Sequence, residues 1–284
     1  MSVACIILNY NSYVETKKLI DEVKSFTAFQ ALIVVDNQST DDSYSLLLRL
    51  QNGLIHVIQT NKNGGFGYGN NVGINYANKL GMTYALITNP DVAFTEKIIP
   101  PLLKTFEQRK KAVVVVPASY KNRNIRAYHV QSNLQIAMSS SLIIKRLFGA
   151  YLGRFRPNEL RTDQPVEIGI FSGALFMVDI SKFIKVGMFD EHVFLYFEES
   201  ILAEKIHRLG LKIYLIPSIT FEHAGGTTVT RSASSFAKIK EYEVTSKRYF
   251  LKKYRNVSGV KLCLYSVFFY ASILEMYLYG VLKK

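Results

Sequence analysis

The sequence "ALIVVDNQSTDDS", residues 31–43, begins with an unbroken apolar run and ends in turn-forming and helix-capping residues. A run that is apolar at every position, rather than at every second one, is typical of a strand covered by helices on both faces. Asp36 follows the run directly, at the carboxyl end of the strand, where open α/β sheets bind their ligands. The local alternative is that Asp36 only caps the turn that follows.

Runs of the same kind recur along the chain, and amphipathic stretches separate them. Strands are expected at "VACIILNY" (3–10), "ALIVVDN" (31–37), "LIHVIQT" (54–60), "YALITNPDV" (84–92), "AVVVVPAS" (112–119), "IGIFSGALFMV" (168–178) and "KIYLIPSITFEH" (212–223). Helices are expected over 13–25, 43–50, 72–80 and 199–210. This alternation predicts an α/β fold with a mostly parallel central sheet flanked by helices.

Composition narrows the class of protein. The chain has 284 residues, which suits one large domain or two small ones. Its cysteines, Cys5 and Cys263, lie at opposite ends, so no disulfide framework is expected and a reducing, cytosolic compartment is the default. The N-terminal sequence has no basic segment and no small-residue cleavage site, and it reads as a buried strand rather than a signal peptide.

The formal net charge of +13 is concentrated in two segments. Residues 119–164 hold eight Lys and Arg against two Asp and Glu, and residues 231–284 hold eleven against three. A nucleic acid, an anionic membrane or a phosphorylated substrate would each explain such a local excess. Since neither zinc-finger spacing nor an RNA-recognition signature accompanies it, no nucleic-acid partner is expected.

The segment "NKNGGFGYGNN", residues 61–71, contains glycines at alternate positions. A dinucleotide fingerprint would follow the first strand, with an acid about twenty residues on, and this segment follows the third. A flexible turn is one alternative. The other is a loop whose backbone lies against a planar ligand, with the amides of Asn63, Asn70 and Asn71 reading a base or a ribose.

Three further segments carry groups that suit catalysis. Asp91 of "LITNPDV" is a turn former by itself, but beside Asp36 it could hold Mg²⁺ or Mn²⁺ against a diphosphate. In "FDEHVFLYFEES", residues 189–200, acids lie among aromatic residues, which should raise their proton affinity and suit general-base work. The alternative there is a solvated helix N-terminus. His223 precedes small residues 225–228 that could contact phosphate, although a lone histidine is more often structural.

In this order, these segments resemble family 2 glycosyltransferases, particularly the rhamnosyltransferase-like branch that builds bacterial cell-surface polysaccharides. The resemblance covers residues 3–230 and rests on "IILNYNS", "VVDNQSTDDS", "NKNGGFGYGNN", "ITNPDV", "FSGALFMV", "GMFDEHVFLYFEE" and "IPSITFEHAGGT". It implies a GT-A catalytic domain over 1–230, with a nucleotide-binding half (1–118) and an acceptor-binding half (119–230). Residues 231–284 would then form a C-terminal helical region.

The resemblance also implies roles for individual residues. The nucleotide would be held by Asn9, Tyr10, Asp36, Asn63, Gly67, Asn70 and Asn89. Asp91 would be the ligand of a Mn²⁺ or Mg²⁺ cofactor, assisted by His223. Glu199 would be the general base, at a position where the family usually has the aspartate of a Glu-Asp pair, and Ile201 stands where many relatives carry another acid.

The implied activity is inverting transfer of a sugar from a nucleotide-diphosphate sugar donor to a hydroxyl of a saccharide acceptor that is lipid-linked. Rhamnose, galactofuranose, glucose and galactose all stay open as donor sugars. Two alternatives belong to other classes, a nucleotidyltransferase that makes nucleotide sugars and a non-catalytic carbohydrate- or membrane-binding module. The first would release pyrophosphate rather than a nucleoside diphosphate, and the second would show no donor hydrolysis.

The C-terminal apolar run, residues 262–282, is long enough for a bilayer crossing, which takes about 20 apolar residues. Glu275 lies inside it, and an acid in lipid costs about 2.5 kcal/mol or more. The basic sequence "KRYFLKKYRN" precedes it and would attract anionic headgroups. We therefore expect a peripheral protein on the cytoplasmic face of the cell membrane, contacting it through 231–284 and the basic segment 119–164. The alternative is a helix pair packed on the domain or in a homodimer.

Overall fold

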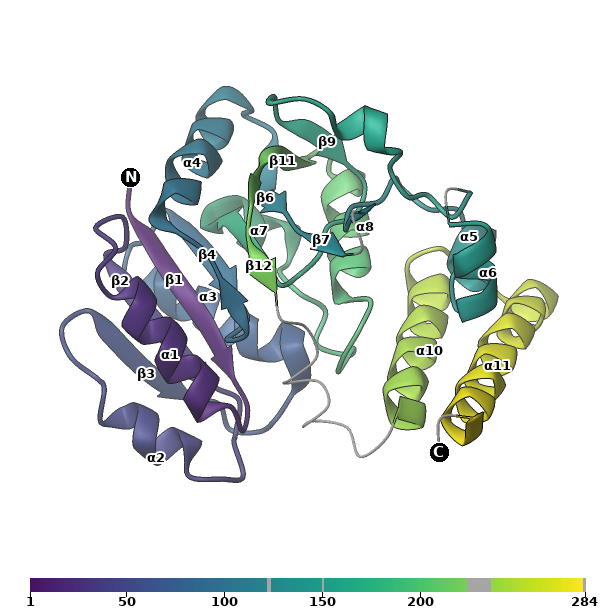
Figure 1. The fold of residues 1–284 in the computed structure, drawn as a ribbon, viewed down its shortest axis with the longest axis horizontal. Helices are drawn as coiled ribbons and strands as arrows, with labels where there is room; N and C mark the ends of the chain where they lie inside the picture. Colours follow the sequence, from purple (N-terminus) through teal and green to yellow (C-terminus); the bar gives the residue numbers. More distant parts are fainter. Residues whose placement is uncertain (122–123, 150, 224–235, 283–284) are drawn as a thin grey trace.

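The computed structural model describes residues 1–121, 124–149, 151–223 and 236–282. Its centre is an eight-stranded sheet with the strand order β3-β2-β1-β4-β10-β6-β11-β9 (Figure 1). The strands are β1 (Val3–Asn9), β2 (Ala31–Asp36), β3 (Ile55–Gln59), β4 (Tyr84–Thr88), β6 (Ala112–Ala118), β9 (Val166–Ile168), β10 (Leu175–Asp179) and β11 (Lys212–Thr220). Six of the eight run in one direction and β9 and β10 oppose them, so the expected mostly parallel sheet is confirmed.

Helices cover both faces of this sheet. Side chains of β1 alternate between the faces: Val3, Cys5 and Ile7 join one core cluster, and Ala4 and Ile6 join the other. The first cluster includes residues of α1 (Tyr13–Val23), α2 (Ser43–Leu48) and α4 (Ile99–Gln108). The second includes residues of α3 (Gly65–Lys79), α7 (Ile180–Val186) and α8 (Glu198–Arg208). The unbroken apolar character of the central strands follows from this double cover.

Two short ribbons and two 3₁₀ turns complete the α/β part. The ribbons pair β5 (Val92–Ala93) with β12 (Glu222–His223) and β7 (Tyr120–Lys121) with β8 (Asn124–Ile125). The turns are η1 (Glu96–Ile98) and η2 (Pro157–Leu160). The ribbon β5–β12 matters for the site, because it joins the segment after β4 to the segment after β11.

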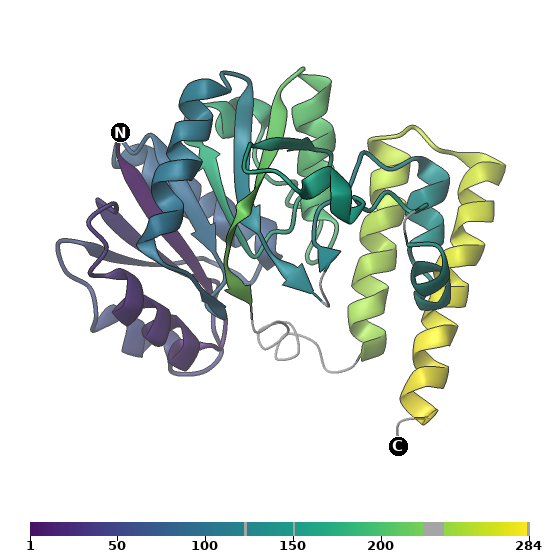
Figure 2. The ribbon, with the colours of Figure 1, turned by 45° about the horizontal axis from the view of Figure 1, so that its top comes forward.

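Four helices form a separate layer at one end of the molecule (Figures 1 and 2). They are α5 (Asn133–Met138), α6 (Leu142–Leu147), α10 (Phe236–Lys253) and α11 (Gly259–Leu282), here called the helical unit. The unit has its own core, which contains Ile136, Val244, Phe250, Leu251 and Phe269. The two basic segments of the sequence, far apart along the chain, therefore pack together. No helix in the described part of the chain has both the length and the apolar character of a membrane span.

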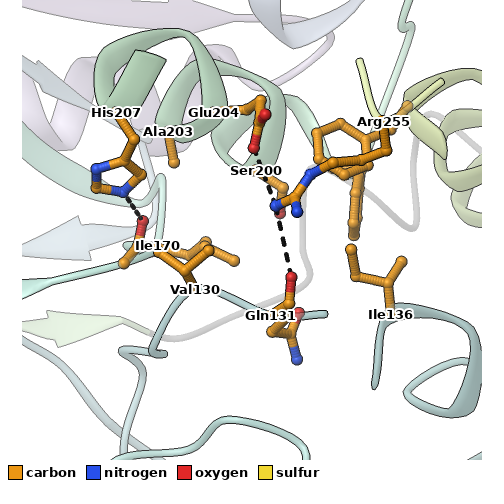
Figure 3. Close-up of a pocket in the computed structure, with 12 residues that line it drawn as sticks. Val130, Gln131, Ile136, Ile170, Ser200, Ala203, Glu204, His207 and Arg255 are labelled. Carbon is orange, nitrogen blue, oxygen red and sulfur yellow. Dashed lines mark hydrogen bonds and ion pairs between the residues drawn. The ribbon is translucent and has the colours of Figure 1, made fainter. Parts of the chain in front are cut away.

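Polar contacts join the helical unit internally and to the sheet domain. Glu275 of α11 accepts hydrogen bonds from the Ser141 hydroxyl (2.6 Å) and the Leu142 N–H (2.8 Å), at the start of α6. At the other junction, Arg255 lies 2.9 Å from Glu204 of α8 and also donates to the Gln131 carbonyl oxygen (Figure 3). The acid inside the apolar run is thus a helix cap within the protein.

Several expected elements differ from the observed ones. The strands expected over 84–92 and 212–223 end at Thr88 and Thr220, and their last residues form the separate ribbon β5–β12. The helix expected over 72–80 begins at Gly65, so most of the glycine-rich segment is helical and not a loop. The strand expected over 168–178 is divided into β9 and β10. The division has a steric cause, because Gly169 lies against the backbone of Val130 and Ile170 pairs with Tyr128, which draws 169–174 out of the sheet.

Candidate active site

Asn9 and Asp36 lie side by side at the carboxyl edge of the sheet, where they are partners in the β1–β2 register. Both are fully buried. The Asn9 amide donates to Asp36 (2.9 Å), and the hydroxyl and N–H of Ser39 and the amide of Gln59 also donate to the Asp36 carboxylate. Asp36 therefore organises the turn after β2, as the capping alternative requires. A contact of Asn9 or Asp36 with a nucleotide stays a prediction.

A small cavity at the same edge brings together three of the expected nucleotide-binding residues. Tyr10, Asn63 and Asn89 line a hollow of about 80 Å³. Asn37 and Phe194, which the sequence did not single out, also line it. The Asn37 amide donates to the Asn63 side chain (3.0 Å). An amide-rich hollow with aromatic walls can hold the flat face and polar edge of a base.

Gly67 and Asn70 lie in the first turns of α3, on its buried side. A Cβ at Gly67 would meet the side chain of Phe189, and one at Gly69 would meet Leu8 and Asn37. The glycines thus let α3 approach the sheet and the 189–194 segment closely, a reason for glycine that the sequence did not reveal. The Asn70 amide donates to the Phe66 carbonyl oxygen (3.0 Å), and ligand contacts by Gly67 and Asn70 stay predictions.

Asp91 and His223 meet through the ribbon β5–β12, in which His223 pairs with Val92. Their side chains are nearly buried, and the His223 Nε2 lies 3.3 Å from an Asp91 oxygen. Two residues that are 132 positions apart in the sequence are therefore adjacent at the carboxyl edge, as the metal-site expectation needs. Residues 225–228, expected to contact phosphate, lie outside the described residues.

The Asp91–His223 pair fits a divalent cation that a substrate helps to hold. A carboxylate and an imidazole are suitable ligands, and Mg²⁺ sites commonly combine one or two carboxylates with substrate phosphates and water. The Nδ1 atom of His223 is buried without a hydrogen-bond partner among the described residues. No described residue therefore fixes the orientation of the ring through that atom. The described chain contains no group of three or more His, Cys, Asp or Glu that could hold a metal alone.

Glu199 lies in the first turn of α8 and lines an open cavity of about 620 Å³. One carboxylate oxygen accepts a hydrogen bond from the Gly173 N–H (2.9 Å). A Cβ at Gly173 would overlap that oxygen, so Glu199 can hold this position only while residue 173 has no side chain. Burial raises the pKa of Glu199 above its ordinary value, which suits a group that must accept a proton.

Glu198, the preceding residue, faces protein rather than the cavity. It is buried, and one carboxylate oxygen has no hydrogen-bond partner among the described residues. Burial, with the charge of Glu199, raises the pKa of Glu198 well above its ordinary value. The two neighbouring acids thus have different surroundings, and only Glu199 lines the acceptor-sized cavity.

The backbone before α8 is strained and touches the hollow that Tyr10 and Asn63 line. Tyr196 and Phe197 both have positive φ values, 66° and 74°, which non-glycine residues rarely adopt. A few residues earlier, the Phe194 carbonyl oxygen accepts from the Phe66 N–H (3.1 Å) at the start of α3. The segment 194–199 therefore connects the nucleotide hollow with the Glu199 cavity.

Known proteins share both sequence and fold with this chain. Residues 4–184 match the family model described as glycosyl transferase family 2. The low-salt glycan biosynthesis hexosyltransferase Agl10 of Haloferax volcanii is 25% identical over 232 residues, which are 81% of this chain and 70% of that protein.

Two solved structures resemble this one at 14% identity, a level that shows the fold alone. GalNAc-T7 with UDP, GalNAc and Mn²⁺ matches with a TM-score of 0.66 over 90% of this chain, which spans only about half (49%) of that longer chain. The mannosyltransferase PcManGT from Pyrobaculum calidifontis, in complex with GDP-Man and Mn²⁺, matches with a TM-score of 0.60 over 95% of this chain and 73% of its own. The sheet with its two helical covers is that of the GT-A fold.

The family model covers well over half of the chain and includes the strands that carry Asn9 and Asp36 and the turn that carries Asp91. The chain belongs to glycosyl transferase family 2.

Proposed function

We propose that this protein is an inverting, metal-dependent glycosyltransferase that transfers a sugar from a nucleotide-diphosphate donor to an acceptor hydroxyl, with Glu199 as the general base. The observation that carries the proposal is the Glu199 carboxylate itself. It is fixed by the Gly173 N–H, has a raised pKa, and opens on a cavity large enough for a saccharide. Those are the properties of a base that meets a neutral hydroxyl.

In the proposed step, Glu199 takes the proton from the acceptor hydroxyl, and the oxygen forms a bond to the anomeric carbon of the donor. The bond from that carbon to the diphosphate oxygen breaks, and its electron pair leaves with the nucleoside diphosphate. Attack from the opposite face inverts the anomeric configuration. Asp91 and His223 would hold Mn²⁺ or Mg²⁺, which would supply positive charge to offset the negative charge on the leaving diphosphate.

The nucleotide binds on the other side of the site, in the hollow of Tyr10, Asn63 and Asn89. Nucleotides and Mn²⁺ in the GalNAc-T7 and PcManGT structures support a nucleotide-sugar donor and a divalent ion here. The choice among uridine, thymidine and guanosine donors is open to a thermal-shift panel of nucleotide diphosphates and their sugars with Mn²⁺. A hexose donor is favoured by the similarity to a hexosyltransferase.

The base assignment is tested with Glu199→Gln, which keeps the shape of the side chain but not its basicity. We expect turnover to fall by about 10²-fold or more, the range of general-base catalysis, while the melting temperature changes little. Glu167→Gln, on an exposed glutamate of β9, is the matched control. Transfer by Glu199→Gln at the control rate would show that another group takes the proton. Release of pyrophosphate instead of nucleoside diphosphate would replace the whole proposal with a nucleotidyltransferase.

The acceptor is proposed to be lipid-linked, with the helical unit resting on an anionic membrane. Apolar side chains of α6 are exposed, among them Ile143 (59%) and Leu147 (68%), and Lys145 and Arg146 lie between them. The apolar face of α11 is exposed too, at Val260, Leu264, Val267, Leu274 and Leu278. An apolar surface with cations interspersed favours an anionic lipid face over a neutral protein partner.

Flotation with anionic liposomes at low salt tests this placement. The wild-type protein should float, and Ile143→Asp combined with Leu147→Asp should remain at the bottom. Val14→Asp is the control, since Val14 is as exposed (74%) but lies on α1, far from the helical unit (Figure 1). A wild-type protein that does not float, but sediments as a dimer that the double variant disrupts, would assign this surface to a homodimer.

A further inference from the structure

We infer that the acceptor carries an oxyanion close to the hydroxyl that is glycosylated, and that Arg126 and Arg154 bind this oxyanion. The inference rests on the proposed function in one respect, that the Glu199 cavity receives the acceptor. The oxyanion belongs either to a phosphoryl group or to the carboxylate of an acidic sugar, which present the same paired oxygens to an arginine.

The lining of the cavity combines acids with a group of cations. The acids are the proposed base Glu199 and Glu243. The cations come from segments that are distant in the sequence. They are Arg126, Lys145, Arg154 and Lys247.

Protein groups occupy one of the two lysines. Lys247 donates to Glu243 (2.6 Å) and to the hydroxyls of Ser139 (3.2 Å) and Ser140 (2.9 Å), which uses all three of its N–H bonds. Burial lowers the pKa of Lys247 to about 7, although the Glu243 carboxylate opposes this shift. Lys247 therefore has no donor left for a ligand, whereas Lys145 makes only a 3.9 Å contact with the same glutamate and can add its charge to the cavity.

The arginines are different. Within the described residues, neither Arg126 nor Arg154 has an ion pair or a side-chain hydrogen bond, although both are partly buried along the wall of the cavity. A guanidinium has five donors and no acceptor, and its planar fork matches the two oxygens of a phosphate or carboxylate. A pair of such groups in the cavity of the base is a binding site for an anion.

The anion of the acceptor explains this site better than the diphosphate of the donor does. The hollow of Tyr10 and Asn63 has no Lys or Arg in its lining. The lining of the cavity at Asp91 and His223 has four acids and a single lysine, Lys18. The diphosphate on that side is matched by a divalent cation, which Asp91 and His223 can hold. The guanidinium pair lies instead in the cavity that contains Glu199, where the acceptor binds.

A binding measurement without turnover tests the site directly. Inorganic pyrophosphate is titrated calorimetrically into the wild-type protein with EDTA present, so that the metal-dependent donor site does not contribute. We expect each of Arg126→Ala and Arg154→Ala to weaken binding about tenfold or more, the loss of one charge-assisted hydrogen bond. Arg161→Ala, an exposed arginine in the same segment but outside the cavity, should bind like the wild type. Equal binding by the double variant and the Arg161→Ala control would overturn the inference.

Transfer kinetics then identify the source of the anion. Three alkyl-linked monosaccharides serve as acceptors: a neutral glycoside, the same sugar on an alkyl diphosphate, and its uronic acid. Preference for the diphosphate assigns the oxyanion to the lipid link, and preference for the uronate assigns it to an acidic sugar. In either case the arginine variants should raise the KM of the anionic acceptor and leave the KM of the neutral acceptor and of the donor unchanged. Equal use of all three acceptors, or a raised donor KM, would refute the inference while leaving Glu199 as the base.

Discussion

At the scale of single residues, Gly173 shows how a position without a side chain can position the proposed base. Its N–H fixes Glu199, and its missing Cβ leaves room for the carboxylate. Gly173→Ala should push the carboxylate aside and lower kcat by about 10²-fold, the usual cost of a misplacement near 1 Å. Gly53→Ala is the control, because a Cβ at Gly53 meets no atom within 4 Å. Steady-state kinetics of both variants check this, and equal kcat values would show that Glu199 tolerates the displacement.

The raised pKa of Glu198 leads to a prediction about the stability of the protein rather than its rate of catalysis. Its raised pKa means that the folded protein holds the Glu198 proton more tightly than the unfolded chain does, whose reference pKa is 4.5. The resulting stabilisation is complete below pH 4.5 and is lost as pH rises through the raised pKa of the folded state. Glu198→Gln removes that loss, so its melting temperature should match the wild type in acid and exceed it increasingly towards neutral pH. Parallel melting curves for the two proteins from pH 4 to 8 would contradict the assignment.

At the scale of elements, the contact between α11 and α6 depends on Glu275. Glu275→Ala removes two hydrogen bonds at the start of α6 and should destabilise the helical unit by about 1–2 kcal/mol, as for the loss of a helix cap. Glu241→Ala removes an exposed ion pair with Lys238 on α10 and should change little. Urea denaturation of both variants gives the difference, and equal midpoints would mean that Glu275 contributes nothing to the junction.

The elements also separate what sequence can predict from what it cannot. The strands β1, β2 and β4 were predictable because each is an apolar run that ends in a polar residue, as at Asp36. The start of α3 was not, since glycine disfavours helices and only the contact with Phe194 and Phe189 explains its presence at Gly65 and Gly67. The pairing of Asp91 with His223 depends on ribbon β5–β12, and so sequence suggested both residues but not their contact.

At the scale of the whole molecule, the helical unit completes the sheet domain. Val193 and Ile201, from the segment around Glu199, are buried in the core that α10 and α11 share. A chain that ends at residue 230 should therefore expose this apolar surface, bind more of the dye ANS and lose transfer activity. A chain that lacks only residues 283–284 should behave like the full-length protein. Full activity of the shorter chain would show that the unit is needed for placement alone.

Two separate parts of the chain supply the cations that line the Glu199 cavity, and this has a consequence for protein engineering. Arg126, Lys145 and Arg154 come from the segment between β6 and β9, and Lys247 comes from α10. A chimera that replaces only one of these parts with that of another enzyme would lose the ion pair of Glu243 with Lys145, because this pair joins the two parts. If the Glu199 cavity binds the acceptor as proposed, the segment between β6 and β9 and helix α10 would have to be transplanted together to change acceptor specificity, while residues 1–118 stay unchanged.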